Sequence, residues 1–319
     1  MSPIVLHFFA VFCAIGLAAI GSGIGQGIAG FGALSSLVRQ RVGGNHIFRA
    51  MVLGLALIES GMILSLVVVL MLLFGGGSTE MTWGVGYAEL GMGLAIGCAA
   101  AAVSVASSFA VKSACISIGR QPYSGQKILT LMLLIQSIIE APVIFALLIA
   151  LLIKTQITDT MSIYHGFTLL GAGLTIAIGS IGPSIGQALF AHSACSAIGL
   201  NAESQNKLLP FSLLSQAVIE TPLIFSLVVA ALLVYKPVSE TMPFVSAIVA
   251  LVVAFAVGVG TAGSAVASGY TAAKSAKSVA LDPDNYTTFL RATLLGQAII
   301  ESAAIYALIV GLILVTRVF

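Results

Sequence analysis

The stretch Leu57-Ile58-Glu59-Ser60 places one carboxylate near the middle of a long apolar segment. The same placement recurs at Ile138-Ile139-Glu140-Ala141, Val218-Ile219-Glu220-Thr221 and Ile299-Ile300-Glu301-Ser302. The four glutamates are 81, 80 and 81 residues apart, which indicates a structural repeat. An ionisable side chain at the centre of a bilayer costs at least ~2.5 kcal/mol, and chance would not renew that cost four times at a fixed interval. The glutamates are therefore the candidate functional residues.

The composition is that of an integral membrane protein. Of 319 residues, 59% are apolar and only 8% are charged, and the mean hydropathy is +1.13; a soluble domain has roughly one-quarter charged residues. The net charge of +2, without a basic stripe, argues against a nucleic-acid partner. The four cysteines stand in apolar segments without Cys-x-x-Cys or histidine pairing, so we expect neither disulfides nor a zinc site.

Eight apolar segments, each longer than the ~20 residues that a bilayer core requires, pair into four hairpins. The predicted helices are 4–39 with 47–75, 84–119 with 125–154, 163–199 with 205–236, and 243–280 with 286–317. We therefore predict an all-α membrane protein of four tandem helical hairpins, which divide the chain into 1–80, 81–160, 161–240 and 241–319. The first segment lacks the basic start of a signal peptide and is interpreted as a retained helix.

The basic residues predict the orientation in the membrane. Ten of the thirteen lysines and arginines lie in or beside the four hairpin turns, and the other three are Lys154, Lys236 and Arg317. By the positive-inside rule the turns are cytoplasmic and both termini lie outside, in a bacterial inner membrane or an equivalent energy-coupling membrane.

The two helices of each hairpin differ in side-chain size. The first is rich in small residues, most clearly in Gly21-Ser22-Gly23-Ile24-Gly25-Gln26-Gly27, and small residues allow helix backbones to approach closely. The second carries the glutamate among bulky residues. We expect the first helices to pack at a small radius and the second ones to lie outside them, facing lipid. The glycine run is not a phosphate loop, because no Lys-Ser/Thr follows it.

Several motifs carry a resemblance to a known family. They are Gly23-Ile24-Gly25-Gln26-Gly27, Arg39 and Leu57-Ile58-Glu59-Ser60 in the first repeat, Arg120-Gln121-Pro122 in the second, and Gly296, Gln297, Ala298, Glu301, Ser302 and Tyr306 in the fourth. With them the chain resembles the c subunit, or proteolipid, of rotary F-type ATP synthases, a hairpin that assembles into a rotor ring. Most such proteolipids are single hairpins, whereas fused ones are more typical of V-type rotors, so a V-type proteolipid is an alternative.

The resemblance implies an ion-translocating rotor-ring component with no catalytic site and no cofactor. Each of Glu59, Glu140, Glu220 and Glu301 would carry one H⁺, or alternatively one Na⁺. The implied partners are further copies of the chain in the ring, a stator a subunit that supplies an arginine, a central stalk, and membrane lipids. The residues that the resemblance turns toward the stalk are Arg39, Gln40, Arg120, Gln121 and Pro122.

The resemblance also implies supporting ligands for the ion. They are Gln26, Ser107, Gln187 and Ser268 on the first helices, the hydroxyls of Ser60, Thr221 and Ser302 directly after a glutamate, and the carbonyls of Ile138 and Val218 two residues before one. Pro142 and Pro222 cannot donate to those two carbonyls, which leaves them free as acceptors or ligands, although the prolines could equally serve only to kink the helix.

The ligand sets bear on the identity of the ion. Na⁺ requires several oxygens, whereas a proton requires one carboxylate and one acceptor. The second repeat, with Ser107 and with Ala141 in place of a hydroxyl, has the poorest set and favours H⁺, unless a neighbouring hairpin supplies what it lacks.

Other functions are less consistent with the pattern. A stand-alone secondary transporter usually has inverted or broken-helix repeats, whereas these repeats are parallel and carry equivalent glutamates. A structural or channel oligomer has no use for carboxylates that face lipid. Glutamates that only hydrogen-bond between helices could be replaced at less cost by glutamine or serine.

Overall fold

The protein is built from long α-helices. The computed structural model describes residues 2–75, 81–158 and 160–319, and within them there is no β-strand. The helices are α1 (Pro3–Arg39), α2 (Gly44–Phe74), α3 (Trp83–Arg120), α4 (Gly125–Ile139), α5 (Ala141–Gln156), α6 (Ile163–Leu200), α7 (Gln205–Tyr235), α8 (Pro243–Leu281) and α9 (Tyr286–Val318). Eight helical spans in the described residues are long and apolar enough to cross a membrane, α4 and α5 together forming one of them. The all-α prediction is confirmed, while the predicted hairpin boundary at residue 80 lies outside the described residues.

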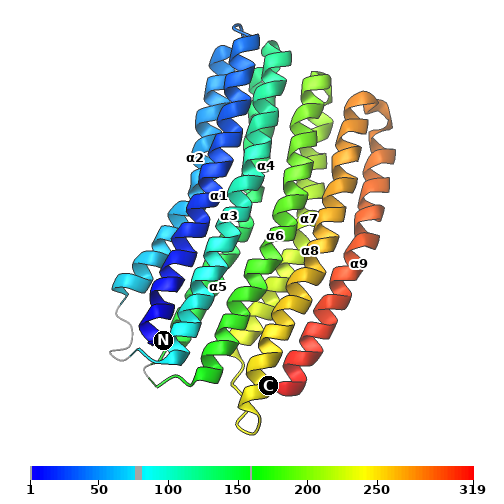
Figure 1. Cartoon of the computed structure of the whole chain (residues 1–319). Helices are drawn as coiled ribbons and strands as arrows, with labels where there is room; N and C mark the ends of the chain where they lie inside the picture. The colour runs from blue at the N-terminus through cyan, green and yellow to red at the C-terminus, as the bar shows by residue number, and fades with distance from the viewer. Residues whose placement is uncertain (1, 76–80, 159) are drawn as a thin grey trace.

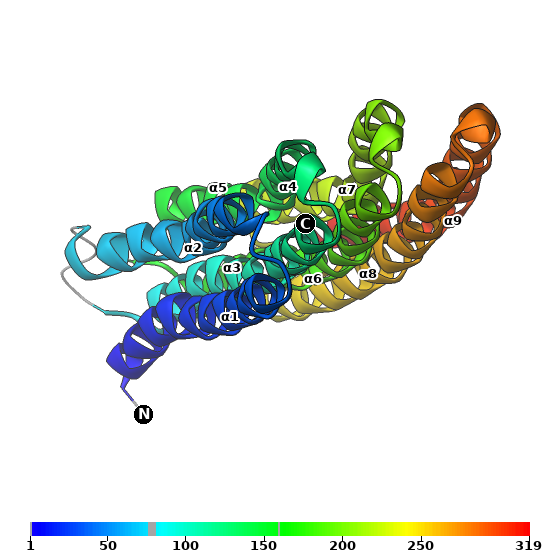
Figure 2. The same cartoon turned by 90° about the horizontal axis from the view of Figure 1, so that it is seen from above.

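The helices form two layers that run through all four hairpins. Seen from above, α1, α3, α6 and α8 lie side by side in one layer, here called the inner layer, and α2, α4 with α5, α7 and α9 form the second, here called the outer layer (Figure 2). The hairpins stand next to one another in chain order, with both termini at the same end (Figure 1).

Small residues allow the inner helices to pack backbone against backbone. Gly91 of α3 faces Gly173 of α6 so closely that a β-carbon on Gly173 would lie 2.7 Å from the Gly91 Cα. Gly269 of α8 is placed against the backbone of Gly186 in α6 in the same way. Neighbouring helices of the outer layer contact one another less extensively. Close inner and looser outer packing agrees with the predicted difference in radius.

One outer helix is broken at its glutamate. The span predicted as a continuous helix over 125–154 ends at Ile139 and restarts at Ala141, so Glu140 stands at the junction of α4 and α5. Pro142 favours a break here, because proline lacks the N–H that continues the helical ladder. The equivalent Pro222 does not interrupt α7, which is a single helix.

Burial falls from the middle of the molecule toward its two lateral edges. In the most apolar part of α6, 78% of the residues are buried, compared with 28% in α1 and 17% in α9. Large apolar side chains such as Phe8 and Phe12 of α1 and Ile299 and Tyr306 of α9 are exposed. The first and last hairpins therefore present open apolar faces.

Candidate functional site

The four repeated glutamates all lie in the outer layer. Glu59 is in α2, Glu140 at the junction of α4 and α5, Glu220 in α7 and Glu301 in α9, and each is half-buried. Among the described residues, no group of three or more His, Cys, Asp and Glu side chains surrounds them. Any cation held at one of these glutamates would therefore depend largely on neutral oxygens.

The Glu140 carboxyl is held between two hairpins. Ser60, in the outer helix of the preceding hairpin, has its Oγ 2.5 Å from Glu140 Oε2. Ser107, in the inner helix of the same hairpin as Glu140, has its Oγ 3.5 Å from the other carboxyl oxygen. The Ser60 hydroxyl also donates to the carbonyl of Leu57 in its own helix, at 2.7 Å. The carboxyl thus joins the first hairpin to the second.

A similar arrangement recurs at Glu301. The side chain beside its carboxyl is that of Thr221, which follows the glutamate of the preceding hairpin just as Ser60 does. The Thr221 hydroxyl also donates within its own helix, to Ala217 O at 3.2 Å. At both boundaries, the residue after one glutamate therefore faces the glutamate of the next hairpin.

This pairing corresponds to the alternative that the sequence left open, in which a neighbouring hairpin supplies a ligand. The alanine at 141 does not weaken Glu140, because the hydroxyl beside Glu140 is that of Ser60. By the same offset Ala141 corresponds to Ser60 and Thr221, so of Glu140, Glu220 and Glu301 it is Glu220 that has no hydroxyl from the residue after the preceding glutamate. The sequence allows such a neighbour but does not identify it, because the partner is 80 residues away.

The inner helices present one polar residue at the level of each glutamate. These residues are Gln26, Ser107, Gln187 and Ser268. The glycine directly before each glutamine packs against the isoleucine directly before the glutamate. A β-carbon on Gly25 would lie 3.1 Å from Ile58 Cγ2, and one on Gly186 would lie 3.0 Å from Ile219 Cγ2. Each glutamine is therefore at the same height in the helix pair as its glutamate. The first and third hairpins therefore share one register between inner and outer helix.

The turns of successive hairpins are linked at one end of the molecule. Gln121 Nε2 donates to Leu200 O at 3.4 Å, and Asn201 Nδ2 donates to Ala280 O at 3.0 Å. The predicted stalk-facing residues lie at this same end, and Arg39 and Arg120 among them are exposed.

The four-hairpin architecture corresponds to a fourfold match with a known family. The sequence model of the c-subunit family of ATP synthases matches the chain at residues 9–72, 90–153, 170–233 and 242–314. The chain belongs to the ATP synthase c-subunit family. The resemblance expected from its motifs is thereby confirmed.

Single-hairpin relatives match about a quarter of the chain each. The ATP synthase c subunit of Alkaliphilus oremlandii is 44% identical over 66 residues, which cover 21% of this chain and 74% of the relative. The c subunit of Dehalococcoides mccartyi is 43% identical over 74 residues, which cover 23% of this chain and 97% of the relative. The chloroplastic c subunit of Ostreococcus tauri is 40% identical over 79 residues, which cover 25% of this chain and 90% of the relative. The chain is thus similar to four such proteins in tandem.

Three glutamines near the glutamates were not predicted as site residues. Gln136 and Gln297 lie one helical turn before Glu140 and Glu301, are fully buried, and donate from Nε2 to the carbonyls of Gly54 and Ser215 in the preceding hairpins, at 3.3 and 3.2 Å. Gln216 occupies the equivalent place in α7. Their signal was in the sequence, since a residue four positions before a glutamate lies on the same helix face.

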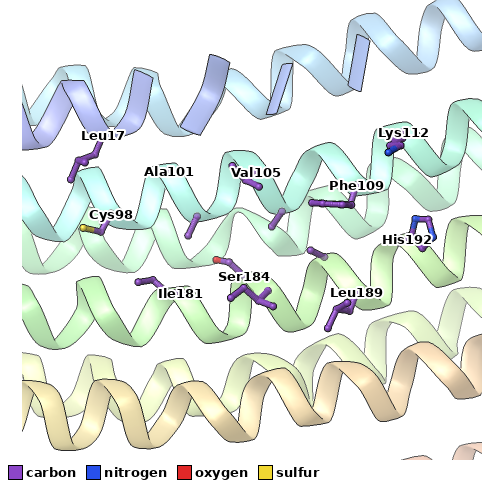
Figure 3. Close-up of a pocket in the computed structure, with 14 residues that line it drawn as sticks. Leu17, Cys98, Ala101, Val105, Phe109, Lys112, Ile181, Ser184, Leu189 and His192 are labelled. Atoms are coloured by element: carbon purple, nitrogen blue, oxygen red, sulfur yellow. The ribbon is translucent and has the colours of Figure 1, made fainter. Parts of the chain in front are cut away.

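A separate groove on the inner layer is not part of these sites. It lies between α3 and α6, has a volume of about 750 Å³, and is lined mainly by apolar side chains, with Lys112 and His192 at one end (Figure 3). His192 Nδ1 is 2.5 Å from Ser113 Oγ. None of the four glutamates lines the groove, and its apolar lining does not suit an ion.

Proposed function

We propose that the chain is an ion-carrying rotor-ring component of an F-type ATP synthase, with no catalytic site of its own. Each of its four hairpins carries one ion on Glu59, Glu140, Glu220 or Glu301, and ion exchange at these carboxyls drives rotation. The observation that carries the proposal is the Glu140 carboxyl held by hydroxyls of two adjacent hairpins, Ser60 and Ser107, in a family-matched repeat.

The proposed ion is H⁺. The Ser60 hydroxyl has one proton, yet its oxygen lies 2.7 Å from Leu57 O and 2.5 Å from Glu140 Oε2. If the proton goes to Leu57 O, which can only accept, the proton between Ser60 and Glu140 must belong to the carboxyl. A neutral carboxyl is also the form that apolar surroundings favour. An intervening Na⁺ would hold the two oxygens further apart.

The same pairing supports assembly into a ring. Ser302 follows Glu301 and donates to Ile299 O at 2.7 Å, so its oxygen is free to accept from a further glutamate. Glu59 has no described hydroxyl from a preceding hairpin. In a ring of identical chains, Ser302 of one copy serves Glu59 of the next, and the open faces of α1, α2, α8 and α9 are covered.

The remaining partners follow from the family resemblance. A stator a subunit supplies the arginine that lets each carboxyl ionise and exchange its proton, and the central stalk binds the hairpin turns. The turns are then cytoplasmic and both termini outside, as the positions of the basic residues predict. Membrane lipids cover the outer layer.

Carbodiimide labelling tests the assignment, because the reagent modifies protonated carboxyls in apolar surroundings. Peptide mapping of the labelled full chain is expected to find Glu59, Glu140, Glu220 and Glu301 modified before the seven other acidic residues. Labelling concentrated instead on acids such as Glu89 or Glu240 would contradict the proposal.

A further inference from the structure

The boundary that contains Glu220 differs from the other described boundaries. Where Ser60 contacts Glu140 and Thr221 contacts Glu301, the equivalent residue for Glu220 is Ala141. Within the described residues no side chain hydrogen-bonds the Glu220 carboxyl. The glutamate thus lacks the partner that Glu140 and Glu301 have.

Two glutamines at the same boundary also lack partners. Gln187 of α6 and Gln216 of α7 are both fully buried, and in each of them neither the Nε2 nor the Oε1 atom has a hydrogen bond. By contrast, Gln136 and Gln297, which are equivalent to Gln216, each bond a carbonyl of the preceding hairpin through Nε2. Four buried amide atoms without partners are unusual, because buried polar groups are nearly always paired.

The register of the third hairpin brings these groups together. Gly186 packs against Ile219. Gln187 directly follows the first of these residues and Glu220 directly follows the second. In the fourth hairpin, the side chain of Gln297 lies 3.4 Å from the backbone oxygen of Ser268. The equivalent pair in the third hairpin is Gln216 and Gln187. Both amides therefore lie at the level of the Glu220 carboxyl.

We propose that the Glu220 boundary binds one water molecule, held by the amides of Gln187 and Gln216, which donates to or accepts from the Glu220 carboxyl in place of a neighbouring hydroxyl. This inference rests on the proposed function of Glu220 as an ion carrier.

The chemistry of the site suits water. Ala141 leaves out the hydroxyl oxygen that Ser60 supplies at Glu140, and a water oxygen replaces it with the same capacity to donate and accept. Each glutamine amide supplies both a donor and an acceptor, and buried waters typically make about three hydrogen bonds to groups of this kind. The water gives Glu220 an exchangeable partner, so that it can hold a proton like the other three glutamates.

The test uses a reciprocal pair of variants in the purified ring of full-length chains. Ala141→Ser places a hydroxyl beside Glu220, and Ser60→Ala removes the one beside Glu140. Cryo-electron microscopy at a resolution that shows ordered water is expected to find density between Gln187, Gln216 and Glu220 in the unmodified ring, and a serine oxygen in its place in Ala141→Ser. Absence of that density in the unmodified ring would overturn the proposal. So would density that lies at the short oxygen distances of a bound Na⁺ and remains in Ala141→Ser.

Labelling rates give a second readout at the level of single sites. Because the serine hydroxyl takes the place of the water, we expect Ala141→Ser to leave the carbodiimide labelling rates of Glu220 and Glu140 unchanged. Ser60→Ala removes the hydroxyl beside Glu140, so it should change the labelling rate of Glu140 by about fivefold, the worth of one hydrogen bond, and leave that of Glu220 unchanged. Gln187→Leu, which removes one amide from the water site, should change the labelling rate of Glu220 alone. If Ala141→Ser changes the rate of Glu220 about fivefold, or Gln187→Leu leaves Glu220 unaffected, the inference fails while the proposed function survives; if the four glutamates are not labelled at all, the proposed function itself fails.

Discussion

Replacing Gly173 by alanine should drive two inner helices apart. A β-carbon on Gly173 of α6 would lie 2.6 and 2.7 Å from the carbonyl carbon and Cα of Gly91 in α3. Both are backbone atoms, which cannot move aside as a flexible side chain can. To bring the 2.6 Å contact to an ordinary 3.4 Å the two helices must separate by at least about 0.8 Å, and a gap of roughly that size forfeits about a quarter to a half of the dispersion energy of the contacts that it opens.

The net effect is a competition between packing and helix propensity. Overpacking typically costs ~1–3 kcal/mol, and we expect the upper part of that range because the contact is backbone to backbone. Alanine is a better helix former than glycine by about 1 kcal/mol. Gly173→Ala should therefore destabilise the protein by about 1–2 kcal/mol, since the packing cost exceeds the propensity gain.

Gly23→Ala is the matched control. Gly23 is an exposed glycine of the inner-layer helix α1, and a β-carbon there would meet nothing within 4 Å. Only the propensity gain remains, so this variant should be as stable as the unmodified chain or more so. The assay is thermal unfolding of the full chain in detergent, followed by helical circular dichroism. A midpoint for Gly173→Ala that is not lower than that for Gly23→Ala would refute close packing as the role of the inner glycines.

Three further predictions address the outer layer, the ion and the assembly. Gln297→Leu should lower the thermal midpoint, because it leaves the Ser215 carbonyl without its donor at a cost of about 1–3 kcal/mol. The control is Leu55→Gln, at the equivalent place in α2, which removes no such hydrogen bond. Millimolar Na⁺ should not protect the four glutamates from carbodiimide at neutral pH, and protection would argue for Na⁺ as the ion. Native mass spectrometry of the purified ring should give a hairpin count divisible by four, most simply twelve hairpins from three chains, and any other count would require a second, shorter proteolipid.

The sequence was sufficient to predict the helices and their layers for a simple physical reason. Apolar segments longer than a bilayer core form helices because every backbone polar group must be paired in lipid. The clustering of glycine in α1, and of glutamate with bulky residues in α2, then distinguished the layer that packs closely from the layer that packs more loosely. Neither step required knowledge of how the hairpins sit beside one another.

The candidate site was only partly predictable, because it lies between hairpins. The glutamates could be recognised because a carboxyl in a bilayer is energetically costly and because their spacing is regular. The partner of Glu140, however, is a hydroxyl from another hairpin, and its assignment depends on how neighbouring hairpins align along their helix axes. The helix break was equally hard to anticipate. Pro142 and Pro222 follow their glutamates at the same distance, yet only the helix with Pro142 is interrupted, so the local sequence does not decide the outcome.

Fusion of the hairpins changes what a single substitution can do to the proposed rotor. In a ring of identical single hairpins, alanine after the glutamate would remove the hydroxyl from every site at once. In this chain Ala141 affects one boundary in four, and at that boundary the buried amides of Gln187 and Gln216 have no hydrogen-bond partner among the described residues. Because one rotor must carry the same ion at all its sites, a change at one boundary is tolerated only if other groups there restore a partner for the carboxyl. The pairing of a lost hydroxyl with two unpartnered glutamines is what such compensation predicts.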